Sequence, residues 1–416
     1  MPRPRNQYDP ERFGRLDGLL PQPEGRITRR QSELPKELEI SGLPEGKWVA
    51  RGVYRMERRF MYGRAYGLSA LEAPAESGRL LARWGGSGSP LFLDTETTGL
   101  SGGTGTYAFL IGLGICGGDA LRVIQLFLAG PTWERDWLAA IEEELPEEFS
   151  LVTYNGRAFD LPLLRTRYTL ARAVPLWEKS AHLDLLTLAR HFYKGRLSSC
   201  SLSSIERNIL GLHRSAEDVP GSEIPWMYTQ FLRSSDAAPL AGIFYHNVLD
   251  IVSLAAFQRH IAKVTLGGGS CASDMLRAGD LWAGAGDYER AERLWRMALD
   301  FPRDRHLALL RLAEKERSAG NFEAAYACYK ESLETERRPV RTLETMAKIE
   351  EHRFRRCEEA LALATEALRW LERHRIFKDR RWEEDRKNLL HRIERLKRKI
   401  AAKECGGDIF AEEEEL

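Results

Sequence analysis

The segment LFLDTETTGL, residues 91–100, is an apolar run that ends on two acidic side chains. Side chains alternate along a strand, so Asp94 and Glu96 project from the same face of the strand predicted here. Two carboxylates held this close repel each other unless they share a proton or a cation. The pair therefore predicts either a perturbed acid or a metal site.

Two further acids accompany predicted elements downstream. Asp160 follows the strand predicted at 150–156, in YNGRAFD, and Asp250 lies in YHNVLD, within a long helix predicted at 240–264. Strand ends and a neighbouring helix can converge on one edge of a sheet, so we expect all four carboxylates around one cavity. Hard oxygen ligands, with no cysteine and a single histidine nearby, select Mg²⁺ or Mn²⁺ rather than zinc. Two such divalent cations about 4 Å apart are a common device for phosphodiester hydrolysis.

These acids have to be positioned by an α/β domain, which we expect at residues 90–266. Apolar segments bounded by glycine predict strands, and Pro131 can begin a helix. A short strand followed directly by a helix is predicted in HLDLLTLARHFY, and we expect a buried, hydrogen-bonded role for Asp184 in this segment. The predicted strands lie at 91–96, 106–116, 120–130 and 150–156. Three strands, a helix, a fourth strand and further helices indicate a mixed sheet flanked by helices.

The composition changes before this domain. Residues 1–45 are rich in proline, arginine and glutamate and predict an extended basic arm. Residues 46–89 contain a short strand segment that we expect to pack on the α/β domain. The arm is a candidate for contact with nucleic-acid phosphates, with a solvated charged surface as the alternative.

The C-terminal part contains an internal repeat. GDYERAERLWRMAL (286–299) is followed 34 residues later by GNFEAAYACYKESL (320–333), and FRRCEEALALATEAL (354–368) repeats the pattern. A helix–turn–helix period of this length is typical of tetratricopeptide repeats, which offer a groove for protein docking. We expect such repeats with a capping helix over 271–403, followed by an acidic tail at 404–416.

DTETTGL, YNGRAFD and YHNVLD, in this order, resemble the three motifs of the DEDD-type 3′→5′ exonucleases. Residues 47–370 are also similar to the bacterial YprB-type exonucleases. This similarity rests on GGTGTYAFLIGLG, HLDLL, SCSLSSIERNILG and the repeat-bearing tail. The resemblance implies a ribonuclease H-like fold and metal-dependent hydrolysis from the 3′ end. It also implies single-stranded DNA rather than RNA as the substrate, and a role in the repair of mitomycin-type damage. The repeats would dock a helicase or another repair protein.

The same resemblance assigns roles to the acids. Asp94 would bridge both metal ions. Glu96 and Asp250 would hold the ion on the nucleophile side, and Asp160 the ion on the leaving-group side. The residues expected to bind substrate, at the terminal nucleotide or at the turn of the second motif, are Thr97, Thr98, Gly99, Leu100 and Asn155.

A fifth group must position or deprotonate the attacking water. The family uses a histidine in the spacing H-x4-D or a tyrosine in the spacing Y-x3-D, whereas Tyr245 and His246 stand in the reverse spacings from Asp250. At 100° per residue, His246 returns to within about 40° of Asp250 on a helix, and Tyr245 lies about 140° away. Histidine also titrates near neutral pH, which suits a general base. We predict His246, with Tyr245 as the alternative if the helix begins later.

Other functions stay open on the sequence alone. An aspartate-nucleophile phosphatase also carries acids at a strand end, but its second acid should be aspartate and a downstream lysine should pair with the phosphoryl group. A ribonuclease of the same fold is not distinguished, because no pattern here discriminates ribose from deoxyribose. A repeat-based scaffold with a vestigial nuclease is the non-enzyme alternative, although none of the four carboxylates is missing.

Composition narrows the class of protein. The 416 residues include 62 basic and 61 acidic ones, so the net charge of +1 does not by itself argue for a nucleic-acid binder. No apolar run approaches the roughly 20 residues of a membrane helix, and the first residues lack a secretion signal. Six cysteines without a CxxC pair predict neither a zinc ribbon nor a disulfide framework. We expect a cytoplasmic monomer that does not contact membranes.

Overall fold

The computed structural model describes residues 27, 38–67, 69–71, 88–99, 105–215, 218–374 and 380–407. Most of the predicted basic arm, Leu100 and the end of the predicted acidic tail lie outside the described residues. The chain divides into two compact units, Met1–Lys263 and Val264–Leu416.

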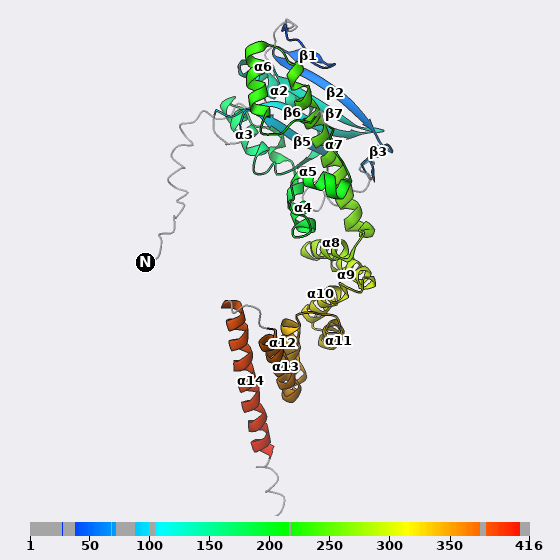
Figure 1. Ribbon diagram of the computed structural model, residues 1–416, viewed down its shortest axis with the longest axis vertical. Coiled ribbons are helices and arrows are strands. Elements are labelled where there is room, and N and C mark those ends of the chain that lie inside the picture. Colours follow the sequence, from blue (N-terminus) through cyan, green and yellow to red (C-terminus); the bar gives the residue numbers. More distant parts are fainter. Residues whose placement is uncertain are drawn as a thin grey trace, which may run out of the picture. The chain divides into compact units, whose positions relative to one another are not determined.

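One mixed sheet of seven strands forms the centre of the first unit (Figure 1). Its strands are β1 (Lys47–Ala50), β2 (Val53–Met61), β5 (Ser89–Thr97), β6 (Ala108–Gly117), β7 (Ala120–Leu128), β8 (Phe149–Thr153) and β9 (His182–Asp184). Their spatial order is β1-β2-β7-β6-β5-β8-β9. β5, β6 and β7 form an antiparallel meander, and β8 and β9 continue in parallel on the other side of β5. β2 pairs with β7, so the predicted N-terminal strand segment extends the same sheet.

Helices cover both faces of this sheet. The longer ones are α2 (Glu134–Glu144), α3 (Asp160–Leu170), α4 (Leu185–Tyr193), α6 (Ile224–Ser234) and α7 (Ala241–Lys263). α7 packs against β5, β6 and β7. α2 lies on the opposite face, where Glu144 accepts a hydrogen bond of 2.5 Å from Arg55 of β2. The α/β fold with helices flanking a mixed sheet is confirmed.

Two glycines of β6 allow α7 to approach the sheet closely. A Cβ atom at Gly112 would lie 2.5 Å from Asn247 Oδ1, and one at Gly114 would lie 2.6 Å from Ile251 Cγ2. Gly112 pairs with Asp94 of β5. Glycine at this point of the strand therefore lets the helix pass directly beside the first predicted site acid.

The segment Ala238–Gly268, which contains α7, is long and apolar enough to cross a membrane by length and composition alone. The expectation that no apolar run approaches this length was therefore wrong. In the structure, 61% of the most apolar 18-residue stretch of this segment is buried inside the protein. Burial of this kind is also found in the central helix of a globular domain.

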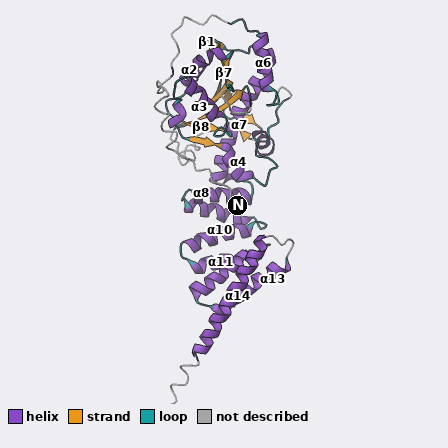
Figure 2. Cartoon of the chain, turned by 90° about the vertical axis from the view of Figure 1, so that its left-hand side faces the viewer, coloured by secondary structure: helices purple, strands orange, loops and turns teal. Residues whose placement is uncertain are grey.

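The second unit consists of helices that pair as hairpins (Figure 2). They are α8 (Ala272–Gly284), α9 (Tyr288–Met297), α10 (Arg305–Ser318), α11 (Phe322–Ser332), α12 (Val340–Ile349), α13 (Cys357–Arg373) and α14 (Arg380–Gly407). α8 packs on α9, α10 on α11, α12 on α13, and α14 on α13. The alanines at equivalent repeat positions, Ala291, Ala325 and Ala360, have no exposed surface. The expected all-helical C-terminal region is confirmed.

Candidate metal and active site

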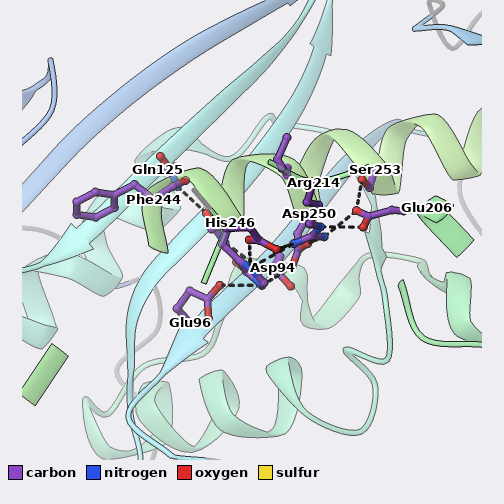
Figure 3. Close-up of polar contacts among 12 residues, drawn as sticks. Asp94, Glu96, Gln125, Glu206, Arg214, Phe244, His246, Asp250 and Ser253 are labelled. Carbon is purple, nitrogen blue, oxygen red and sulfur yellow. Dashed lines mark hydrogen bonds and ion pairs between the residues drawn. The ribbon is translucent and has the colours of Figure 1, made fainter. Parts of the chain in front are cut away.

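β5 and α7 bring three of the predicted acids together. Asp94 and Glu96 project from the face of β5 that α7 covers, and Asp250 comes from α7 (Figure 3). Glu96 is only 8% exposed. The period of two in the strand and the close approach of the helix together produce this cluster.

Asp160 reaches the same site from the start of α3. It accepts a hydrogen bond of 2.6 Å from the hydroxyl of Thr95, the residue between the two strand acids. Asp94, Glu96 and Asp160 all line one pocket of about 680 Å³. A pocket of this size is within the range that holds a nucleotide-sized ligand.

The four carboxylates are electrostatically costly together. Burial raises the pKa of Asp94 and of Glu96 well above the usual range, and Asp250 and Asp160 raise both further. Burial raises the pKa of Asp160 to about 6, against the opposing hydrogen bond from Thr95. Burial also raises the pKa of Asp250, although His246 and Arg214 oppose the shift. Such a cluster takes up protons or cations in preference to staying fully ionised.

The donor set fits a hard divalent cation. Glu96, His246 and Asp250 each offer one ligand atom, and these atoms lie within 4.8 Å of one another. Carboxylate oxygens are the ligands that Mg²⁺ and Mn²⁺ prefer, and imidazole is accepted by transition metals. Asp94 and Asp160 add further oxygens to the same cavity.

His246 faces the acids with one ring nitrogen. Its Nε2 lies 3.5 Å from Asp250 Oδ2 and 4.0 Å from Glu96 Oε1, and its Nδ1 lies 2.6 Å from Asp218 Oδ1. Arg214 Nη1 also lies 3.2 Å from Nδ1, but Asp218 Oδ1 is nearer at 2.6 Å, and a carboxylate accepts hydrogen bonds. We therefore assign the hydrogen to Nδ1, which donates a hydrogen bond to Asp218. In the neutral ring, Nε2 is then a proton acceptor directed into the cluster. The hydroxyl of Tyr245 instead accepts a hydrogen bond of 3.2 Å from Ser215.

The predicted substrate residues divide into three groups. Thr97, Gly99 and Asn155 line the pocket. Thr98 does not, and its hydroxyl donates a hydrogen bond of 3.3 Å to the carbonyl of Tyr107. The predicted contribution of Leu100 concerns a residue outside the described part of the chain.

The turn that leads to Asp160 is held by Asp184. Asn155 has a φ of 64°, in the left-handed region that asparagine tolerates better than most residues. Its N–H donates a hydrogen bond of 2.7 Å to Asp184 Oδ1, and the N–H of Arg157 donates one of 3.2 Å to Oδ2. Asp184 is 8% exposed and also accepts from the N–H of Leu186 at the start of α4. It thus has the buried, hydrogen-bonded position expected of it.

Two buried amides that sequence reasoning missed fix Asp94. Gln125 Nε2 donates to Asn247 Oδ1 at 2.9 Å, and Asn247 Nδ2 donates to Asp94 Oδ2 at 2.9 Å. The pair connects β7, α7 and β5 beside Gly112. A glutamine inside the apolar run ALRVIQLFL, and an asparagine one helical turn before Asp250, were the available signals.

Arg214 and Glu206 were also missed. Arg214 donates to Asp250, and its Nε and Nη2 donate to Glu206 at 2.8 and 2.7 Å. Glu206 begins a single π-helical turn, Glu206–Leu210, that ends at Gly211, whose φ is 65°. Just before this turn, the side chain of Ser201 caps α5 (Leu202–Ile205). Nothing in the segment after Gly211 indicates that an arginine returns to the acids.

Comparison with known proteins agrees with this fold. Residues 91–262 match the RNase H superfamily, so the first unit contains an RNase H-like domain. The chain is also 39% identical over 176 residues to the "Uncharacterized protein YprB" of Bacillus subtilis (strain 168), covering 42% of each chain. The similarity thus spans less than half the length of that relative.

Proposed function

We propose that the chain is a metal-dependent 3′→5′ exonuclease of the DEDD type that acts on single-stranded DNA ends in DNA repair. The observation that carries this proposal is the convergence of Asp94, Glu96, Asp160 and Asp250 on one site of an RNase H-like domain. Nucleases of this fold use acidic residues to bind divalent cations. The 3′→5′ direction and the repair role rest on the resemblance of the three motifs.

Two Mg²⁺ or Mn²⁺ ions would be held by these four residues, with Asp94 shared between them. The ions would supply positive charge at the reacting phosphate and lower the pKa of the attacking water. The raised pKa values of the acids support this assignment, because cations relieve the repulsion that the buried carboxylates otherwise experience.

His246 would accept the proton of the attacking water at Nε2. Asp218 holds the Nδ1 side of the ring at 2.6 Å and fixes the tautomer that leaves Nε2 free to accept. The positive charge that develops on the ring would be stabilised by Asp218 and by the adjacent acids. The same pairing of carboxylate and imidazole orients general bases in other hydrolases.

The substrate end would lie in the pocket of about 680 Å³ beside the acids. Thr97, Gly99 and Asn155 line it and offer polar groups to the terminal nucleotide. Phe159, which is 56% exposed, and Leu163 add apolar surface suited to a base. A single strand suits such a pocket better than a duplex end, because a stacked and paired base would first have to be extruded.

The helical hairpins of the second unit would be tetratricopeptide repeats that dock a helicase or another repair protein. Hairpins at an offset of 34 residues with fully buried alanines support this part of the proposal. A pull-down with the full chain that recovers no partner, while a positive-control repeat protein does, would count against it.

The function is tested with 5′-labelled single strands of DNA and of RNA, each incubated with Mg²⁺, Mn²⁺ or EDTA. We expect a DNA ladder that shortens from the 3′ end, with no cleavage in EDTA. Asp160→Ala should abolish cleavage and expose any contaminating nuclease. Asp119→Ala, at a side chain that is 66% exposed, should leave it unchanged. DNA strands that stay intact in both metals, or a ladder that persists in Asp160→Ala, would contradict the proposal.

A further inference from the structure

One arginine contacts the acidic site at Asp250. The guanidinium of Arg214 donates to Asp250, and Figure 3 shows it between Asp250 and Glu206. Its Nη1 lies 3.5 Å from Asp218 Oδ2. The side chain is only 15% exposed, so this cation faces three carboxylates with little water around it.

Arg214 is anchored from the side opposite Asp250. Glu206 accepts from its Nε and Nη2 in a two-point contact, and the Glu206 side chain is 3% exposed. Ser253 of α7 donates a further hydrogen bond of 2.5 Å to Glu206. A guanidinium held in this way keeps its charge and its orientation.

No other arginine or lysine of the described residues forms an ion pair with any of the four site acids. Arg214 is therefore the arginine or lysine whose charge pairs with the site acids while no metal is bound. Its contact uses Oδ1 of Asp250, a residue that also contributes to the candidate metal cluster with Glu96 and His246. A divalent cation bound by these ligands would share Asp250 with Arg214, and the guanidinium charge a few ångströms away would repel it.

We propose that Arg214 is a tethered internal cation that competes with the divalent metal for Asp250 and thereby weakens metal binding. This inference rests on the metal site of the proposed function. In this proposal Arg214 acts through Asp250 and does not contact the substrate. Glu206 limits the competition, since it shares with Asp250 the charge and the hydrogen bonds of the same Nη2 group.

The test is calorimetric titration of Mn²⁺ alone into the full chain, without nucleic acid. Arg214→Gln should bind Mn²⁺ about tenfold more tightly than the natural chain, a difference of roughly 1.4 kcal/mol. Arg55→Gln is the matched control. Arg55 is 14% exposed and also contacts two carboxylates, but these belong to β2 and α2. Its removal should leave Mn²⁺ affinity unchanged.

Glu206→Gln provides a second variant with the opposite sign, which also serves if Arg214→Gln does not fold. Without the negative charge of Glu206, less of the Arg214 charge is neutralised, so Arg214 should compete more strongly for Asp250 and Mn²⁺ affinity should fall severalfold. Unchanged or weaker Mn²⁺ binding in Arg214→Gln, or unchanged or tighter binding in Glu206→Gln, would overturn the proposal and make the arginine a structural support. Absence of Mn²⁺ binding in every variant would instead refute the metal site itself.

Discussion

Gly112→Ala should separate the two elements that build the candidate site. The added Cβ would lie 2.5 Å from Asn247 Oδ1 and 2.9 Å from Ile251 Cγ1. An ordinary contact needs about 3.5 Å, so α7 would have to move away from β6 by roughly 1 Å. α7 carries both His246 and Asp250, and Asn247 holds Asp94.

This movement of α7 should lower both the stability and the activity of the protein. Overpacking of this kind lowers the free energy of unfolding by about 1–3 kcal/mol. A displacement of about 1 Å in the reacting groups lowers activity roughly 100-fold. Urea denaturation and the rate of release of the 3′ nucleotide measure the two effects separately.

Gly117→Ala is the matched control on the same strand. A Cβ there meets nothing within 4 Å. It should therefore be neutral or slightly stabilising, because alanine restricts the unfolded chain more than glycine. If Gly112→Ala were as stable and as active as Gly117→Ala, close approach of α7 to β6 would not be what positions the site.

Three further predictions concern other parts of the chain. Burial raises the pKa of Asp160 from 3.8 to about 6. Between these pH values the folded state binds more protons than the unfolded state, so in EDTA the free energy of unfolding should fall as pH rises from about 4 to 6. Urea titrations should show a weaker fall in Asp160→Asn, and an equal fall in both proteins would contradict the cause given. Asp218→Ala should lower the single-turnover cleavage rate at least 100-fold at saturating Mn²⁺, since it removes the acceptor of His246 Nδ1; a rate equal to that of Asp119→Ala would refute this role. Ala325 of α11 has no exposed surface, so Ala325→Leu should destabilise the second unit by about 1–3 kcal/mol in thermal unfolding. The cleavage assay should show unchanged nuclease activity. An unchanged unfolding transition would contradict tight packing at the repeat alanines.

The parts that local pattern determines were predictable from the sequence. Alternation in a strand places Asp94 and Glu96 on one face, and the helical spacing of four places His246 beside Asp250, 3.5 Å away. The glycine-bounded apolar segments predict the strands β5, β6 and β7. These patterns act over a few residues, so no knowledge of the tertiary structure is needed to interpret them.

The residues that surround these acids depend on contacts between distant segments. Arg214 and Asp218 come from an irregular segment without hydrophobic periodicity, and only the fold brings them to α7. Gln125 reaches Asn247 across 122 positions of the chain. A polar side chain inside an apolar strand signals a buried partner, but it does not say which one.

The central claim is that the four carboxylates bind two divalent cations at the reacting phosphate. Anomalous diffraction from crystals grown with Mn²⁺ and a short DNA strand tests it most directly. We predict two manganese peaks about 4 Å apart, both within coordination distance of Asp94, one shared with Glu96 and Asp250 and the other near Asp160. Crystals without manganese between these acids, or with manganese bound only elsewhere, would contradict the claim.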